Sequence, residues 1–116
     1  MDFNFEKLTI YQKANNFVDQ AYILTRKYSK EEMFGLVAQL RRAAVSISIN
    51  IAEGSARTKK DFSRFLDMAR GSAFECVAIL EISLRQKYID KIKFNELKKS
   101  LAEIAKMISV LKRSIR

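Results

Sequence analysis

This sequence offers few side chains that could carry out catalysis. None of its 116 residues is a histidine, which excludes Ser-His-Asp and Cys-His nucleophilic systems and zinc sites built on histidine. The Glu-x-x-His motif of di-iron bundles is excluded for the same reason. The single cysteine, Cys76, has no neighbouring base to generate a thiolate, so we interpret it as a small buried hydrophobic residue. We therefore predict a protein that is not an enzyme and needs no cofactor.

Three glutamates could in principle hold a divalent cation: Glu53, Glu75 and Glu81. A hard cation needs several converging oxygen atoms, and the sequence shows no acidic cluster. Glu53 stands four residues before Arg57, which is the spacing of an ion pair on one helix. Glu75 is placed to meet Arg41 or Arg42 on an antiparallel neighbour. We favour structural ion pairs and predict no metal site.

A polar line runs through an otherwise apolar segment, at the spacing of one helical face: Gln39, Arg42, Ser46, Asn50 and Glu53. Asn50 also falls on the stripe that should face the core, where an amide needs a hydrogen-bond partner. We interpret it as a structural residue that fixes register or oligomeric state, as a buried asparagine does in coiled coils. A binding site along this line is the alternative.

Positive charge is concentrated near the end of the chain. The chain has 22 basic and 13 acidic residues, a net charge of +9. Residues 85–116 hold 10 of the basic and 3 of the acidic residues, which gives +7 of that total. Six of these cations are predicted to form one outward stripe on a helix: Lys91, Lys98, Lys99, Lys106, Lys112 and Arg113.

Such a one-sided basic stripe is typical of a surface that binds a polyanion. We interpret it as a nucleic-acid-binding surface that contacts backbone phosphates, and a merely solvated face is the alternative. The sequence has no helix-turn-helix, zinc finger or aromatic stacking motif, so it gives no indication of sequence-specific readout.

The elements that position these residues are predicted to be helices, because the chain has no proline and only three glycines. Thr9 and Gln12 have the spacing of a capping box, which predicts a first helix from there to about Lys27. Its expected inner face is Leu8, Tyr11, Ala14, Val18, Ala21 and Leu24. Ser29 and Glu32 form a second capping box, so a second helix should start after a very short turn, with Tyr28 and Met33 as a hydrophobic staple.

The second helix is expected to bury Leu36, Leu40, Ala43, Ile47 and Ile51. It should end near Gly54 in a left-handed conformation. Eleven of the seventeen residues in 36–52 are apolar and surround most of the helix. A helix that is apolar nearly all round must be buried nearly all round. We therefore predict self-association through three of these residues: Val37, Val45 and Ile49.

Thr58 is predicted to cap a third helix, in which Gly71 would mark the close approach of another backbone. Asp90 should cap a fourth helix, with Ile89 and Phe94 as a staple. The apolar residues of this helix follow the heptad pattern of left-handed bundles: Phe94, Leu97, Leu101, Ile104, Ile108, Leu111 and Ile115. Such short connections make successive helices antiparallel. We predict an all-α protein, with residues 1–116 forming one antiparallel up-and-down four-helix bundle.

The sequence also bears on localisation. The first residues mix Asp2 and Glu6 with apolar residues and show no signal-peptide pattern. Polar residues, Gln39 and Arg41 among them, interrupt the most apolar window, so we expect no membrane-spanning helix. Together with the single cysteine, this predicts a cytoplasmic protein.

Residues 35–54, which read GLVAQLRRAAVSISINIAEG, resemble a family. It is that of the bacterial four-helix-bundle proteins first noticed as products of intervening sequences in 23S ribosomal RNA genes, to which accessory variability proteins of diversity-generating retroelements are related. The similarity extends over nearly the whole chain through residues 11–14, Arg57, residues 65–66, residues 69–72 and Glu75. The chain has Tyr11 where the family usually has tryptophan, and Tyr28-Ser29 where it usually has Phe-Pro.

The resemblance implies a homo-oligomer shaped as a ring of five bundles, with a basic surface that binds RNA. Our leading hypothesis is therefore an oligomeric, non-catalytic module that binds structured RNA or a protein–RNA complex. A protein–protein adaptor with no direct role in nucleic-acid binding is the alternative.

Overall fold

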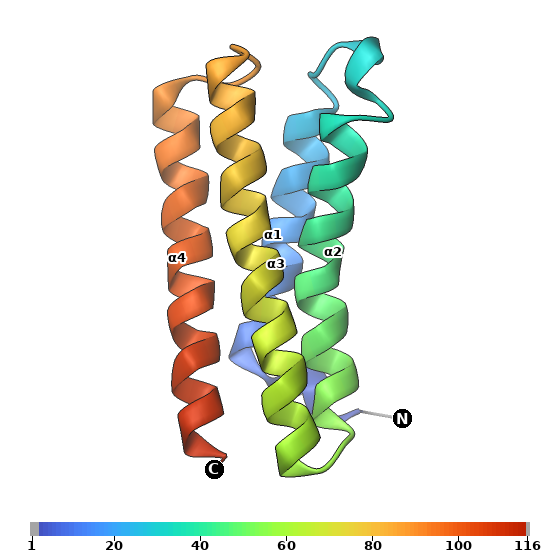
Figure 1. Cartoon of the computed structure of the whole chain (residues 1–116), viewed down its shortest axis with the longest axis vertical. Coiled ribbons are helices and arrows are strands. Elements are labelled where there is room, and N and C mark those ends of the chain that lie inside the picture. The colour runs from blue at the N-terminus through green and yellow to red at the C-terminus, as the bar shows by residue number, and fades with distance from the viewer. Residues whose placement is uncertain (1–2, 116) are drawn as a thin grey trace.

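The computed structural model describes residues 3–115, which contain helices and no strand. The α-helices are α1 (Thr9–Thr25), α2 (Leu36–Ser55), α3 (Lys59–Arg85) and α4 (Lys91–Ser114). Two short 3-10 helices, η1 (Asn4–Lys7) and η2 (Lys30–Glu32), precede α1 and α2. The four α-helices run antiparallel in a bundle 42 Å long (Figure 1). The predicted all-α four-helix bundle is confirmed.

Each helix packs against its neighbours in the chain, and α1 also packs against α4. In Figure 1, α4, α3 and α2 lie side by side in front of α1. The α1–α2 and α3–α4 connections lie at one end of the bundle, and the α2–α3 connection lies at the other. None of the helices in residues 3–115 is long and apolar enough to cross a membrane.

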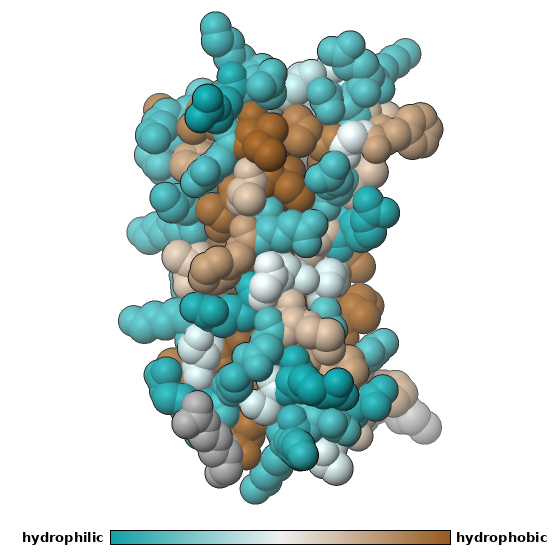
Figure 2. All heavy atoms as spheres, viewed as in Figure 1, coloured by the Kyte–Doolittle hydropathy of each residue, from teal (hydrophilic) through white to brown (hydrophobic). Residues whose placement is uncertain are grey.

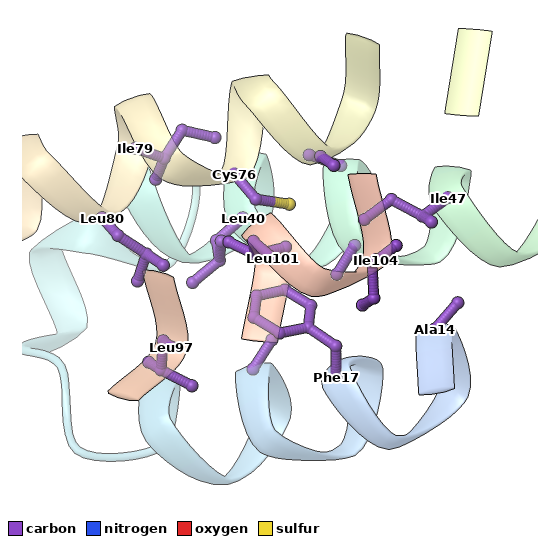
Figure 3. Close-up of a cluster of buried hydrophobic side chains, with 14 of the residues drawn as sticks. Ala14, Phe17, Leu40, Ile47, Cys76, Ile79, Leu80, Leu97, Leu101 and Ile104 are labelled. Carbon is purple, nitrogen blue, oxygen red and sulfur yellow. The ribbon is translucent and has the colours of Figure 1, made fainter. Parts of the chain in front are cut away.

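The core draws apolar side chains from all four helices (Figure 3). Five of the seven seam residues predicted for α4 are at most 4% exposed: Phe94, Leu97, Leu101, Ile104 and Ile108. The last two, Leu111 and Ile115, are only partly buried. The inner face of α1 differs from the prediction. Ile10 and Phe17 are buried, whereas Leu8, Tyr11 and Val18 are only partly buried. Since α1 packs against both α2 and α4, its buried face follows both neighbours.

Two of the predicted helix starts are confirmed by their hydrogen bonds. The Thr58 hydroxyl accepts from the backbone N–H of Asp61 at 3.2 Å, at the start of α3. The Asp90 carboxylate accepts from the backbone N–H of Lys93 at 2.7 Å, at the start of α4. Each bond satisfies one of the backbone donors left free in a first helical turn.

The capping box predicted at Thr9 is wrong, although α1 does begin there. Thr9 is the first helical residue, and the cap position belongs to Leu8, whose side chain makes no capping hydrogen bond. The Gln12 amide donates to the backbone oxygen of Glu6 at 3.3 Å instead. The side chain of Gln12, which the capping box required, is therefore bonded to the η1 helix instead.

The second capping box is also wrong, and α2 starts later than predicted. The Ser29 hydroxyl makes its hydrogen bond with Tyr88, at 3.0 Å, and not with the first turn of η2. The Glu32 carboxylate instead accepts from the backbone N–H of Leu36 at 3.2 Å, where α2 begins. Met33 is 47% exposed and forms no buried staple. A contact between distant parts of the chain has replaced the local one.

The roles predicted for the two glycines, Gly54 and Gly71, are both wrong. Gly54 lies within α2 and has no positive φ, so it is not a left-handed terminator. A Cβ atom at Gly54 would lie 2.6 Å from Cβ of Phe65 and 2.9 Å from Cδ1 of Phe62, both on α3. A Cβ atom at Gly71 would meet no atom within 4 Å. The close approach of two helices therefore occurs at Gly54.

Candidate nucleic-acid interface

The outer surface of α4 carries a basic stripe of five exposed cations: Lys91, Lys98, Lys99, Lys106 and Arg113. Among residues 3–115, no carboxylate lies within ion-pair distance of any of them. The apolar seam of α4 turns toward the core, and these positions of the heptad therefore turn away from it. The structure thus brings together five of the six predicted cations as a positive surface that has no ion-pair partner among the described residues.

Lys112, the sixth predicted cation, is placed differently. Its Nζ atom donates to the Asp67 carboxylate of α3 at 2.7 Å, and its side chain is 30% exposed. The pair offsets the charge of Lys112 and joins the end of α4 to the beginning of α3. We therefore exclude Lys112 from the basic stripe.

Phe94 helps to position the start of the stripe. Its ring is buried, and the Nζ atoms of Lys91 and Lys98 lie 5.5 and 5.6 Å from its centroid. Cations at this distance are attracted to the ring quadrupole. The two lysine side chains therefore lie along the surface of α4 at its N-terminal half.

A groove lies beside the stripe, between α3 and α4. It has a volume of about 530 Å³ and a floor of small and apolar side chains: Ala73, Val77, Ala78, Leu101, Ala102 and Ala105. Lys98 and Lys106 of the stripe also line it. On the same face of the molecule, Figure 2 shows apolar atoms over α3 with hydrophilic side chains projecting along the edge formed by α4.

Two residues of α3 at this groove were missed by the sequence analysis. Phe74 is 56% exposed, and the guanidinium carbon of Arg70 lies 4.6 Å from its ring centroid. The only signal in the sequence was their spacing of four residues, which places both on one helical face. Their exposure depends on where α4 packs, which the spacing does not reveal.

The flank of α4 that faces α1 carries acidic residues. Glu103 forms an ion pair with Lys13 of α1, and Glu96 pairs with Lys93 at 2.9 Å. The hydrogen bond from Lys13, followed by the charges of Lys13 and Lys99, lowers the pKa of the Glu103 carboxyl. Among the described residues, the basic stripe thus has no ion-pair partner, although the charge of Lys99 acts on Glu103, whereas Glu103 and Glu96 are paired with Lys13 and Lys93.

The polar line of α2 is bonded to α3 through one of its residues, Ser46. Ser46 and Asn50 are half-buried, whereas Gln39, Arg42 and Glu53 are exposed. The Asn50 amide donates to the backbone oxygen and the hydroxyl of Ser46, at 2.9 and 3.0 Å. Ser72 of α3 donates to the same hydroxyl at 2.9 Å. Asn50 therefore finds its partner on its own helix, and Ser46 makes the link to α3.

The structure contradicts the ion pairs predicted for two glutamates, Glu53 and Glu75: among residues 3–115 neither forms one. The Arg57 guanidinium lies over the ring of Phe65, 4.8 Å from its centroid. The Arg41 guanidinium donates to the Thr25 hydroxyl at 2.9 Å. Within the described residues no group of acidic side chains or cysteine is placed to hold a metal ion.

Cys76 lies in the core, as predicted. It is fully buried, and its sulfur points into the cluster of apolar side chains (Figure 3). Burial, with a smaller contribution from the charge of Glu75, raises the pKa of the Cys76 thiol to about 12. At neutral pH it is therefore a thiol and not the reactive thiolate.

The three residues predicted to mediate self-association differ in how far they are exposed. Val37 is 2% exposed, so its inclusion was wrong: it packs within its own bundle. Val45 is half-buried, and Ile49 is 50% exposed on the outer face of α2. Only the last two remain available for contact with another copy.

Comparison with known proteins places the chain among relatives. A sequence model of the family described as "23S rRNA-intervening sequence protein" matches residues 6–110. A crystal structure of a protein with unknown function from the S23 ribosomal protein family, from Bacteroides thetaiotaomicron, has a similar fold, with a TM-score of 0.83. The two chains are 24% identical, and the match covers 90% of this chain and 98% of that one. No curated protein sequence matches the chain.

Proposed function

Because the chain belongs to the family of 23S rRNA-intervening sequence proteins, we propose that it is a non-catalytic, homo-oligomeric module that binds structured RNA or a protein–RNA complex. The observation that carries this proposal is the basic stripe on α4, five exposed cations with no carboxylate within ion-pair distance among residues 3–115. The family name supports it, because it connects these proteins with a ribosomal RNA.

The stripe suits the RNA backbone. α4 has 24 residues, so it spans about 36 Å at 1.5 Å per residue. That length can follow several successive phosphates. Lysine acts on phosphate as a mobile point charge, and backbone contacts carry no direct sequence information. We therefore expect binding to depend on charge and on RNA shape, and each neutralised phosphate to release counterions.

Self-association would multiply these contacts. Ile49 is half exposed on the outer face of α2, next to the half-buried Val45 along the helix turn. Contact between copies would remove both side chains from water. Several stripes in one assembly would then bind a single RNA together, with an avidity above that of one stripe.

The test of RNA binding is a triple charge reversal in the stripe, K98E/K99E/K106E. A matched control, K27E/K30E/K60E, makes the same change in net charge at exposed lysines outside the stripe. We expect the stripe variant to lose RNA affinity and much of its salt dependence, whereas the control retains most of both. Filter binding over a range of salt concentrations measures both quantities, and circular dichroism checks the fold.

If the stripe variant and the wild-type protein bind RNA with equal affinity and equal salt dependence, the proposal is wrong. The stripe is then a solvated face, and the adaptor function takes its place. Equal losses in the stripe variant and in the control would also contradict the proposal, because they would show that only total charge matters.

The test of assembly is Ile49→Glu. A carboxylate in an apolar contact loses its hydration without gaining a partner, which costs several kcal/mol. Light scattering on the eluted protein should show a multiple of 13.4 kDa for the wild-type chain and a smaller mass for the variant. A wild-type monomer at micromolar concentration would refute self-association.

A further inference from the structure

The α3–α4 groove has the size and shape of a ligand site. Its volume of about 530 Å³ falls within the range of about 300–1,000 Å³ usual for small-molecule pockets. Alanines on both helices, including Ala78 and Ala102, leave this space open, because longer side chains would fill it. The floor offers apolar surface and the rim offers charge.

Phe74 stands at this groove with more than half of its surface exposed. The Arg70 guanidinium lies 4.6 Å from the ring centroid, so a ring and a planar cation share one site. Aromatic rings and guanidinium planes are the two protein surfaces on which unpaired bases of RNA stack. A purely apolar ligand would make no polar or charged contact with the Arg70 guanidinium.

The charges around the groove select an anionic ligand. Arg70 comes from α3, and Lys98 and Lys106 come from α4, against one carboxylate, that of Glu81. Lys98 and Lys106 also belong to the basic stripe, so a backbone bound along the stripe passes the mouth of the groove. An uncharged helix of another protein bound here would leave these positive charges without a partner of opposite charge.

We infer that the groove between α3 and α4 receives one unpaired nucleotide of the bound RNA. Its base stacks on Phe74 above the alanine floor, and the backbone phosphates on either side of it lie between Lys98 and Lys106. This inference rests on the proposed function and narrows its ligand: the RNA must carry a bulge or a loop, and a perfectly paired duplex would occupy the stripe alone.

Two RNA hairpins test the inference, one perfectly paired and one identical except for a single unpaired purine. The wild-type protein should prefer the bulged hairpin. Stacking on an aromatic side chain contributes about 1–3 kcal/mol per base, so Phe74→Leu should weaken binding of the bulged hairpin about tenfold. The same variant should leave the affinity for the paired hairpin unchanged.

Two further variants serve as controls. Phe74→Trp keeps an aromatic surface and should retain the preference for the bulged hairpin. Met68→Leu alters another exposed apolar residue of α3 that does not line the groove, and should change neither affinity. A fluorescent purine analogue at the unpaired position reports stacking directly, because its emission should fall on binding to the wild-type protein and not to Phe74→Leu.

The outcomes separate this inference from the proposed function. Salt-dependent binding of both hairpins with equal affinity, unchanged by Phe74→Leu, overturns the inference and leaves the proposed function standing. Failure of both hairpins to bind overturns both. If Phe74→Leu instead lowers the mass measured by light scattering without changing RNA preference, the groove is a contact between copies, and the inference is again wrong.

Discussion

The α2–α3 and α1–α4 seams of the bundle are packed in different ways. Between α2 and α3 the backbones come so close that Gly54 leaves no room for a Cβ atom, and Ser46 bonds to Ser72 across the seam. Between α1 and α4 a hollow of about 420 Å³ remains, lined in part by long polar side chains. The Lys13–Glu103 ion pair bridges that seam at the surface.

The difference in packing indicates which parts of the bundle stabilise the fold and which are free to bind a ligand. Close packing places apolar atoms in contact and makes the α2–α3 seam sensitive to small changes in volume. The outer surface of α4 takes no part in such packing, and its cations are available to a ligand. Changes in the basic stripe should therefore leave stability nearly unchanged, whereas changes in the α2–α3 seam should lower the free energy of unfolding.

The largest expected effect comes from comparing two isoleucines, one in the tightly packed core and one beside the α1–α4 hollow, after each is truncated to alanine. Ile47 of α2 is fully buried, whereas Ile23 of α1 is 55% exposed beside the α1–α4 hollow. Ile47→Ala should lower the free energy of unfolding by about 2–5 kcal/mol, because it leaves a cavity in the core. Ile23→Ala should change it by less than about 0.5 kcal/mol. Urea denaturation measures both, and equal losses would contradict the comparison.

A second pair of variants tests the close approach of α2 and α3 by replacing each of two glycines with alanine. Gly54→Ala should destabilise the protein by about 1–3 kcal/mol, because the new methyl group would displace Phe65 and Phe62. Gly71→Ala meets open space within a helix and should stabilise the protein by about 1 kcal/mol. Thermal unfolding distinguishes the two signs. A stabilising Gly54→Ala would show that α2 and α3 can separate at little cost.

The smallest effect concerns the ion pair between α1 and α4. Lys13 lowers the pKa of Glu103, so the pair stabilises the fold at neutral pH and this contribution is lost as the pH falls through the lowered pKa. Lys13→Gln should therefore raise the Glu103 pKa, measured by NMR titration. Its effect on melting temperature should fade in acid. Lys93→Gln, which removes the partner of Glu96, serves as the control and should leave the Glu103 pKa unchanged.

The sequence predicted those features that depend on neighbours in the chain. The caps at Thr58 and Asp90 form because each side chain reaches an N–H three residues ahead. The α4 seam follows from apolar spacing alone. Local pattern was sufficient in these places because no distant residue competes for the same groups.

The features that the sequence missed depend on distant contacts. Ser29 bonds to Tyr88, which lies 59 residues away, and so gives up its predicted role as a cap. The sequence does not show which of Gly54 and Gly71 lies against another helix, because that depends on how the helices pack. Phe74 reads as one more apolar residue of α3 until the position of α4 leaves it exposed. The candidate groove could therefore be recognised only in the folded molecule.

The order of the helices around the bundle also has a consequence for how the chain folds. Among residues 3–115, three of the packed pairs join consecutive helices, whereas α1 and α4 must meet across nearly the whole chain. Closing so long a loop costs conformational entropy before any contact offsets it. We expect the α2–α3 hairpin to be formed in the folding transition state and the α1–α4 seam to close last. The same seam should open first, so backbone amide hydrogens of α1 should exchange with solvent sooner than those of α2 and α3.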